Sequence, residues 1–417
     1  MTSEGILYCL LGLVVGYVWL TLSKKVTGMN EFSRIKNDLK KFVSNDKRIQ
    51  SLFPPEYVCS AGAVDETPFS SSNWLDVSEG RVAEIKTSLE RRIEKAALES
   101  RDFADAMRYA FKKPGKMIRS RLVILLGDIL QVDSEKLVLL AQAVELEHCA
   151  SLLHDDVVDD ADMRRGIESH RKKFGDRVAV LTGDNLISIL VDVLTDIGDM
   201  RVTETVSSSI EALVIGELIQ LMGSLQEGGN LDHIFPINIR SNEVGNLIYI
   251  YLRKSFFKTA SLFACLSRCV GLLADKQLEP LAIAKLTSFG FFFGLAFQLV
   301  DDLLDLTETA DDELVVGKPV GGCDVRNGTI TLPILLAADE GLGPTEQQEL
   351  LKMIKRRFKL GGDVERVFAL IQKSGAIDRS RKIVSYFLNR ARADLRSVVN
   401  DTHVIEGLLR DYESRRC

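Results

Sequence analysis

Apolar residues recur at helical spacing along most of the chain, and this pattern limits the fold more than any other feature of the sequence. The repeat is strongest in six segments, which are residues 122–130, 136–153, 178–200, 206–225, 244–273 and 281–305. No proline lies between Pro114 and Pro236, and no convincing run of alternating strand residues is present. The sequence therefore predicts an all-α fold, in which helices of a bundle face one another.

Aspartate clusters follow two of the apolar segments. The first cluster lies in LLHDDVVDD and contains Asp155, Asp156, Asp159 and Asp160. On a helix, residues four apart share a face, so Asp155 projects with Asp159 and Asp156 projects with Asp160. Like charges at this spacing destabilise a helix unless a cation lies between them. Carboxylates that leave room for water and phosphate suit Mg²⁺, so the cluster predicts a magnesium site.

The second cluster lies in FQLVDDLLD and contains Asp301, Asp302 and Asp305. A single acidic helix is most often a solvated face. Two DDxxD patterns behind apolar helices instead favour one metal site that both helices share. An EF-hand calcium loop fits worse, because it needs alternating ligands and a central glycine, and Val157 and Val158 interrupt that pattern.

Basic motifs accompany the acidic ones, and Lys and Arg bind phosphate firmly. A basic cluster taken alone would be a solvated face. Four such stretches stand out in the sequence: PGKMIRSR at 114–121, RRG at 164–166, FKTA at 257–260, and GKPVGGCDVRNGTITLP at 317–333.

The order of these motifs resembles that of the trans-isoprenyl diphosphate synthases, the chain-elongating prenyltransferases, over roughly residues 80–417. PGKMIRSR is similar to the family's GGKRxRP, but Pro114, Met117 and Ser120 stand where Gly, Arg or Gln, and Pro are usual. The resemblance implies an isoprenoid-synthase-type helical bundle with a central active-site cavity. It also implies head-to-tail condensation of isopentenyl diphosphate onto an allylic diphosphate, with about three Mg²⁺ ions.

The resemblance also assigns roles to particular residues. It implies metal binding by the six motif aspartates, with Asp155, Asp159 and Asp301 as leading ligands and Asp156, Asp302 and Asp305 as direct or water-mediated ones. It implies that isopentenyl diphosphate is bound by Lys116, Arg119, His148 and Arg165. It implies that the allylic diphosphate is bound by Arg164, Lys258 and Lys318. The resemblance makes Lys258, Thr259 and Gln298 the catalytic residues, with the last two directing oxygen dipoles at the allylic cation.

Small residues precede the first motif, which looks most like the long-chain polyprenyl synthases of solanesyl or decaprenyl type. Short-chain relatives place aromatic residues at the positions of Ala150 and Ser151, so the resemblance implies a long product, such as a quinone side chain. A geranylgeranyl or other shorter-chain synthase is the alternative. A class I terpene cyclase is less favoured, since its second motif would carry Asn, Ser or Thr, and Glu. A silent partner subunit is expected to lose motif aspartates, and all six are present.

The N-terminal region is expected to lie outside the catalytic domain. Residues 5–22 carry no charge and have about the minimum length for a membrane-spanning helix, and Lys24 and Lys25 follow. We therefore expect residues 1–25 to be a membrane anchor, with the catalytic domain on the cytoplasm-like side. A removed targeting segment and a helix docked on the protein itself remain alternatives. Residues 26–77 form a polar stretch and linker, and residues 78–417 form the prenyltransferase domain.

Composition excludes several other classes of protein. The net charge of −6 argues against a nucleic-acid partner. The chain has seven cysteines and no CxxC pair, which predicts reduced thiols without a zinc site. The expected partners are the two diphosphate substrates, a mitochondrial inner or endoplasmic reticulum membrane, and a second subunit, either identical or related.

Overall fold

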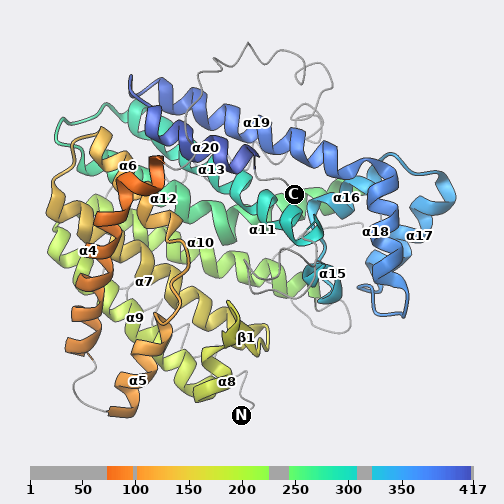
Figure 1. The fold of residues 1–417 in the computed structure, drawn as a ribbon, viewed down its shortest axis with the longest axis horizontal. Helices are drawn as coiled ribbons and strands as arrows, with labels where there is room; N and C mark the ends of the chain where they lie inside the picture. The colour runs from red at the N-terminus through yellow and green to blue at the C-terminus, as the bar shows by residue number, and fades with distance from the viewer. Residues whose placement is uncertain (1–72, 97–100, 225–243, 308–321, 415–417) are drawn as a thin grey trace.

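The computed structural model describes residues 73–96, 101–224, 244–307 and 322–414. Helices make up this part of the chain apart from one short hairpin, so the all-α prediction is confirmed (Figure 1). The elements in chain order are α4 Asn73–Ala96, α5 Arg101–Ala110, α6 Ile118–Ile129, α7 Ser134–Val158, β1 Met163–Arg164, β2 Ile167–Glu168, α8 His170–Phe174, α9 Asp176–Ile197, α10 Met200–Ser224, α11 Val244–Ser255, η3 Phe256–Ala260, α12 Ser261–Leu273, α13 Pro280–Thr307, α15 Cys323–Arg326, α16 Leu332–Asp339, α17 Pro344–Lys355, α18 Asp363–Ser374, α19 Ala376–Arg396 and α20 His403–Ser414.

Helix α7 runs through the core and carries the first aspartate cluster at its C-terminal end. The helix is capped by Asp133, whose side chain accepts hydrogen bonds from two backbone amides of the first turn. Near its other end α7 packs closely on α9. A β-carbon on Gly183 of α9 would lie 2.3 Å from Nε2 of His154, so a larger residue there would displace the imidazole ring. The two helices therefore hold the aspartate cluster in a fixed position.

The KT motif lies in η3, a π-helical turn between α11 and α12. Glycines let the neighbouring helices contact the backbone of this turn. A β-carbon on Gly216 of α10 would lie 2.7 Å from the backbone nitrogen of Lys258. A β-carbon on Gly294 of α13 would lie 2.6 Å from the α-carbon of Ala260. The π-helical turn therefore packs tightly between α10 and α13. Single π-helical turns inside helices are frequent at functional sites, and this one brings Lys258 close to α10.

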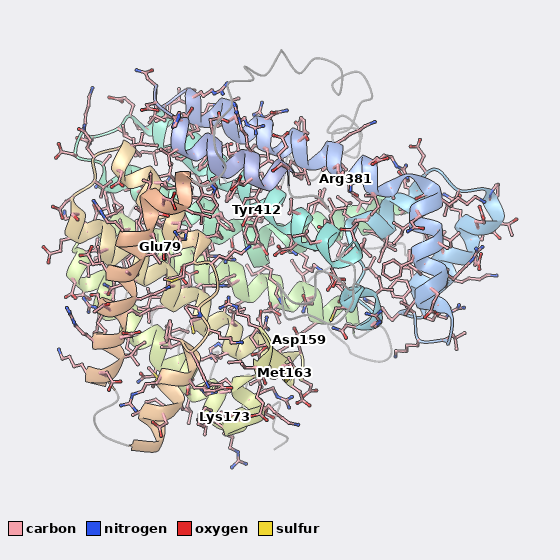
Figure 2. All side chains as sticks on the ribbon, in the orientation of Figure 1. Glu79, Asp159, Met163, Lys173, Arg381 and Tyr412 are labelled. Atoms are coloured by element: carbon pink, nitrogen blue, oxygen red, sulfur yellow. The ribbon has the colours of Figure 1, made fainter. Side chains whose placement is uncertain are left out.

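The C-terminal helices cover one side of the bundle. Tyr412 of α20, labelled in Figure 2, is buried and its ring contacts Phe293 and Phe297 of α13. Trp74 of α4 donates a 2.5 Å hydrogen bond to Asp411, which ties the first described helix to the last. Helix α4 begins at Asn73, a few residues before the expected start of the domain at 78.

Three described segments are long and apolar enough to cross a membrane, namely Asp176–Ile197, Ile250–Leu273 and Pro280–Thr307. Between 50% and 72% of each apolar stretch is buried inside the bundle, so these residues serve largely as core. The expected anchor at 1–25 and nearly all of the expected linker lie outside the described residues, as does Lys318.

Candidate active site

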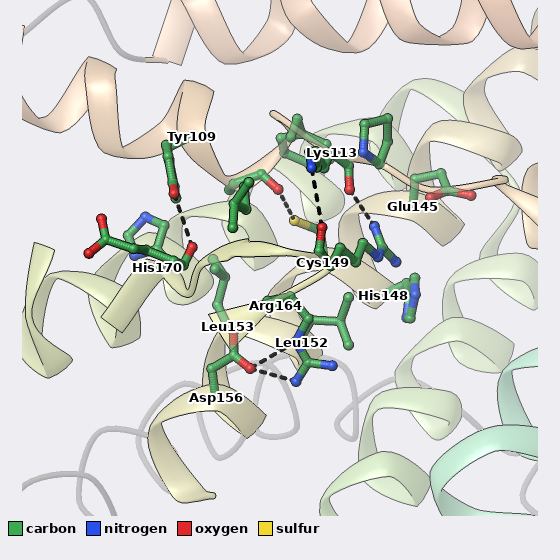
Figure 3. A pocket seen from close by; sticks show the side chains of 16 residues that line it. Tyr109, Lys113, Glu145, His148, Cys149, Leu152, Leu153, Asp156, Arg164 and His170 are labelled. Carbon is green, nitrogen blue, oxygen red and sulfur yellow. Dashed lines mark hydrogen bonds and ion pairs between the residues drawn. The ribbon is translucent and has the colours of Figure 1, made fainter. Parts of the chain in front are cut away.

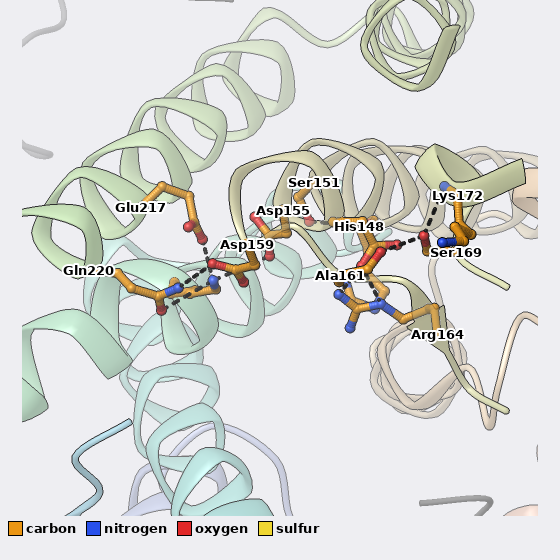
Figure 4. Close-up of polar contacts among 12 residues, drawn as sticks. His148, Ser151, Asp155, Asp159, Ala161, Arg164, Ser169, Lys172, Glu217 and Gln220 are labelled. Carbon is orange, nitrogen blue, oxygen red and sulfur yellow. Dashed lines mark hydrogen bonds and ion pairs between the residues drawn. The ribbon is translucent and has the colours of Figure 1, made fainter. Parts of the chain in front are cut away.

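The first aspartate cluster meets α10 and the π-helical turn (Figure 4). Lys258 Nζ lies 3.3 Å from Oδ2 of Asp155 and 2.5 Å from Oε1 of Glu217. It also donates a 3.3 Å hydrogen bond to Gln220 Oε1, while the Gln220 amide donates to Asp159 at 3.2 Å. A single ammonium group thus bridges α7 and α10 beside the expected metal ligands.

Glu217 and Gln220 were not among the residues predicted from the sequence. Burial, and then the charge of Asp155, raise the pKa of Glu217 to about 8. The nearby ammonium of Lys258 opposes that shift, so Glu217 and Asp155 share one cation. The sequence signal for both residues was weak, because it consisted only of two polar residues spaced three apart in an apolar helix.

The RRG motif forms the turn of the β1–β2 hairpin. Arg165 and Gly166 have φ values of 52° and 73°, as both central residues of a type I′ turn require. Arg164 donates two hydrogen bonds, of 2.9 and 2.5 Å, to one carboxylate oxygen of Asp156 (Figure 3). Arg165 turns the other way and donates to the backbone carbonyl of Lys113 at 2.6 Å. The two adjacent arginines therefore have different partners, a carboxylate of the first cluster for Arg164 and a loop carbonyl for Arg165.

A pocket beside α7 is lined by two of the four residues expected to bind isopentenyl diphosphate, His148 and Arg165 (Figure 3). Its lining includes Lys113, His148, Arg164 and Arg165, and its volume is about 60 Å³. Arg119 extends to His148, with 3.3 Å between Nη1 and Nε2. Burial and the neighbouring arginines hold the pKa of His148 well below its usual range, so its imidazole is neutral. Arg119, His148 and Arg165 therefore lie near one another beside α7, while their role in binding isopentenyl diphosphate stays a prediction.

Two further residues of PGKMIRSR have structural contacts. Ser120, which stands where the family usually has proline, donates a 2.7 Å hydrogen bond to buried Glu145. Arg121 donates to the carbonyls of Lys116 and Leu75, and so joins the motif to α4. The departure from the family pattern at Ser120 thus supplies a partner for a buried carboxyl group. Lys116 itself is exposed.

The second aspartate cluster is held by neutral groups. Asp302 is 4% exposed and accepts hydrogen bonds of 2.6 Å from the Tyr251 hydroxyl and 2.8 Å from the Gln298 amide. Thr259 donates in turn to Gln298 Oε1 at 2.6 Å. Burial raises the pKa of Asp302 to about 6. Thr259 and Gln298 therefore lie together as expected, and Tyr251 is an additional member that sequence reasoning missed.

The other aspartates of the two clusters differ in exposure. Asp305 is buried and accepts hydrogen bonds of 3.1 and 2.9 Å from the backbone amides of Cys323 and Asp324, at the start of α15. Asp301 is exposed on α13. Asp160 is exposed and pairs with Arg171 at 3.0 Å. Asp305 thus holds the start of α15, whereas Asp301 is accessible from solvent.

The carboxylates suit a metal that arrives with its substrate. Within residues 73–414, leaving aside the undescribed gaps, no three His, Cys, Asp or Glu side chains lie close enough to hold a metal ion by themselves. Mg²⁺ is typically bound by one or two carboxylates together with substrate phosphates. The oxygen-only donors at Asp155, Asp159 and Asp301 fit that mode of binding.

Comparison with known proteins identifies the family. The profile of the Polyprenyl synthetase family matches residues 100–371. A prenyl transferase of Synechocystis is 34% identical over 308 residues, covering 73% of this chain and 86% of that protein. The mitochondrial solanesyl-diphosphate synthase 1 of rice is 32% identical over 314 residues, which span 71% of this chain and 66% of that protein.

A solved structure agrees with these sequence matches. The polyprenyl synthase of Caulobacter crescentus, crystallised with calcium and isoprenyl diphosphate, has a TM-score of 0.70 and 27% identity, covering 84% of this chain and all of that chain. The chain belongs to the polyprenyl synthetase family. It has the fold of these enzymes and is a prenyltransferase.

Proposed function

We propose that this chain makes long all-trans polyprenyl diphosphates by condensing isopentenyl diphosphate head to tail with an allylic diphosphate. The observation that carries the proposal is the pairing of two unlike anion sites. At one site Lys258 lies against the carboxylates of the first cluster. The other site is a pocket lined by His148 and Arg165, and Arg119 contacts His148 there. An enzyme that ionises one diphosphate and retains the other needs both kinds of site.

Different residues bind the two diphosphate substrates. Lys258 and Arg164 lie at the aspartates and neutralise the allylic diphosphate. Arg165 and Arg119 bind the isopentenyl diphosphate, which must not leave. Mg²⁺, when bound with the allylic diphosphate, stabilises the negative charge that develops as the carbon–oxygen bond breaks. Thr259 orients Gln298, whose carbonyl oxygen stabilises the allylic cation.

The competing functions differ in a measurable product. A class I terpene cyclase would consume only the allylic diphosphate, and a silent subunit would release no pyrophosphate. The test supplies radiolabelled isopentenyl diphosphate with farnesyl or geranylgeranyl diphosphate, with and without Mg²⁺, and separates the products by chromatography. Labelled products longer than geranylgeranyl diphosphate, formed only with Mg²⁺, support the proposal. Products that stop at geranylgeranyl diphosphate establish the shorter-chain alternative instead.

Product length is proposed to depend on the small residues one turn before Asp155. A residue there lies about 5.4 Å deeper along α7, where an elongating chain would pass. Ala150 is 2% exposed and Ser151 is half-buried, so an added ring at either position would fill space near the site. Ala150→Phe and Ser151→Phe should shorten the product toward farnesyl or geranylgeranyl diphosphate. Wild-type product lengths from both variants at the wild-type rate would contradict this path.

The cellular setting extends the same proposal. The similarity to a mitochondrial solanesyl-diphosphate synthase supports a role in quinone side-chain synthesis at a mitochondrial membrane, with the endoplasmic reticulum as the alternative. Residues 5–22 would anchor the enzyme near its insoluble product. The apolar stretch of α9 is only 50% buried, which favours a homodimer or a complex with a related subunit. Carbonate extraction of full-length protein and of a variant lacking residues 1–27 tests the anchor, since only the full-length protein should stay in the membrane.

A further inference from the structure

A second lysine lies one helical turn before the KT motif. Lys254 is half-buried near the end of α11, four residues before Lys258. Side chains four residues apart on a helix project to the same side. Lys254 therefore presents a second ammonium group on the side of this segment from which Lys258 reaches the aspartates.

The contacts of the two lysines differ. Lys258 is engaged by Asp155 and Glu217 at 3.3 and 2.5 Å. Lys254 lies instead over the ring of Tyr251, with 5.7 Å between Nζ and the ring centroid, and it forms no ion pair with a carboxylate of the described residues. A lysine can bind an incoming anion more easily when it does not first have to leave a carboxylate.

The surroundings of Lys254 connect it to the second aspartate cluster. The hydroxyl of Tyr251, the tyrosine that Lys254 lies over, donates to Asp302 at 2.6 Å. Burial lowers the pKa of Lys254, and the charges of Asp302 and Asp324 oppose that shift. The negative charges of Asp302 and Asp324 therefore attract the Lys254 ammonium, although it forms no ion pair with a carboxylate of the described residues. A partly buried charge in this state interacts strongly with a ligand, because little water screens it.

We propose that Lys254 is an additional binding residue for the allylic diphosphate, contacting the phosphate oxygens on the side of the second aspartate cluster. The proposal rests on the proposed function, since it assigns a residue to one of that reaction's two substrates. Lys258 would hold the diphosphate from the side of the first cluster and Lys254 from the other. The diphosphate would thus be neutralised from both helices by fixed charges as well as by bound metal.

The test compares Lys254→Met and Lys254→Arg with a matched control, Arg253→Met. Arg253 is the adjacent cation, is also half-buried, and lies over the Phe257 ring at 5.8 Å. Loss of one hydrogen bond to a charged group corresponds to about a tenfold weakening. Lys254→Met should raise the KM for farnesyl diphosphate about tenfold and leave that for isopentenyl diphosphate within about twofold. Lys254→Arg should recover most of the loss, and Arg253→Met should resemble wild type.

Calorimetry with inorganic pyrophosphate and Mg²⁺ separates this inference from the proposed function, because it requires no turnover. Lys254→Met should bind pyrophosphate about tenfold more weakly than wild type, with an unchanged thermal unfolding midpoint. If wild-type protein condenses nothing but this difference in pyrophosphate binding holds, the proposed function fails, and Lys254 stands as a diphosphate-binding residue without a role toward an allylic substrate. Equal pyrophosphate affinity, equal KM changes for both substrates, or the same losses in Arg253→Met would overturn the assignment. If Lys254→Met is unstable, Lys254→Gln takes its place under the same criteria.

Discussion

The two aspartate clusters have nearly the same sequence but are held in different ways. On α7, Asp155 and Asp156 are paired with the charged groups Lys258 and Arg164. On α13, Asp302 is held by a tyrosine hydroxyl and an amide, and Asp305 by backbone amides. Side chains held by charged partners can exchange them for substrate and metal. Carboxylates that accept hydrogen bonds from neutral donors are oriented without a directly bonded cation, which leaves them able to bind a metal ion.

Helices α7 and α13 also differ about two turns before their aspartate clusters. Eight residues before Asp155, α7 carries Glu147, which is 3% exposed and has both carboxylate oxygens without a hydrogen-bond partner in the described structure. Eight residues before Asp301, α13 carries Phe293, which is fully buried in an aromatic cluster. Two helices with similar aspartate motifs therefore differ in the residues two turns before the motif. Helix α7 has the buried carboxyl group of Glu147 there, which is destabilising, and α13 has an apolar ring.

The largest expected effect comes from removing a leading ligand of either cluster. Asp155→Ala or Asp301→Ala should reduce Mg²⁺-dependent pyrophosphate release about a thousandfold, since several kcal/mol of charge stabilisation is lost. Asp160→Ala serves as the control, because Asp160 is not among the six motif aspartates, is exposed, and pairs with Arg171. Initial rates at saturating substrate measure the effect. Turnover near wild type in either ligand variant would rule out a shared metal site.

Glu147→Gln should change stability rather than chemistry, and the change should depend on pH. Burial raises the pKa of Glu147 from 4.5 to about 8, so the folded state binds a proton that the unfolded state releases. This raised pKa lowers stability progressively as pH rises from about 4.5 to about 8, with a full cost on the order of a few kcal/mol. Glu147→Gln removes the ionisable group, so the variant should be more stable than wild type at pH 8.

Urea unfolding of Glu147→Gln and wild type at pH 5 and pH 8 measures this difference. The two proteins should have similar midpoints at pH 5, where the buried carboxyl is largely protonated, and should diverge at pH 8. Glu84→Gln, an exposed glutamate on α4, is the control and should differ little from wild type at either pH. A constant difference between Glu147→Gln and wild type at both pH values would show that packing, not ionisation, governs the site.

The adjacent arginines should separate the two substrates. Arg165→Gln should raise the KM for isopentenyl diphosphate about tenfold and change that for the allylic substrate less, because Arg165 turns toward the loop at Lys113. Arg164→Gln should show the opposite bias, since Arg164 pairs with Asp156. Steady-state kinetics with each substrate varied in turn checks both. Equal effects on both substrates from both variants would refute the division.

Sequence reasoning predicted the helices and the clusters because periodicity and charge spacing are local properties. All six predicted apolar segments correspond to helices, and Thr259 and Gln298 do lie together. The partners from other helices were not predictable, because Glu217, Gln220 and Tyr251 become significant only when α10 and α11 pack against α7 and α13. The close approach of α10 depends on Gly216, and no local pattern distinguishes that glycine from others in the chain.

Tyr251→Phe should give the smallest effect. It directly tests whether uncharged hydrogen-bond donors hold Asp302 on α13. The variant loses one 2.6 Å hydrogen bond to Asp302 but keeps the bond from Gln298 and the apolar ring. A net hydrogen bond of about 0.5–1.5 kcal/mol corresponds to a loss of roughly two- to tenfold in kcat/KM for the allylic substrate.

The Tyr251 hydroxyl also opposes the raised pKa of Asp302, so its loss should move the acidic limb of the pH–rate profile upward from about 6. Tyr386→Phe on α19, a tyrosine whose ring packs on Phe387, is the control and should leave rate and pH profile unchanged. If Tyr251→Phe instead lost activity as completely as Asp301→Ala, the hydroxyl would have to act on substrate directly, and the contrast between charged and neutral support of the two clusters would not hold.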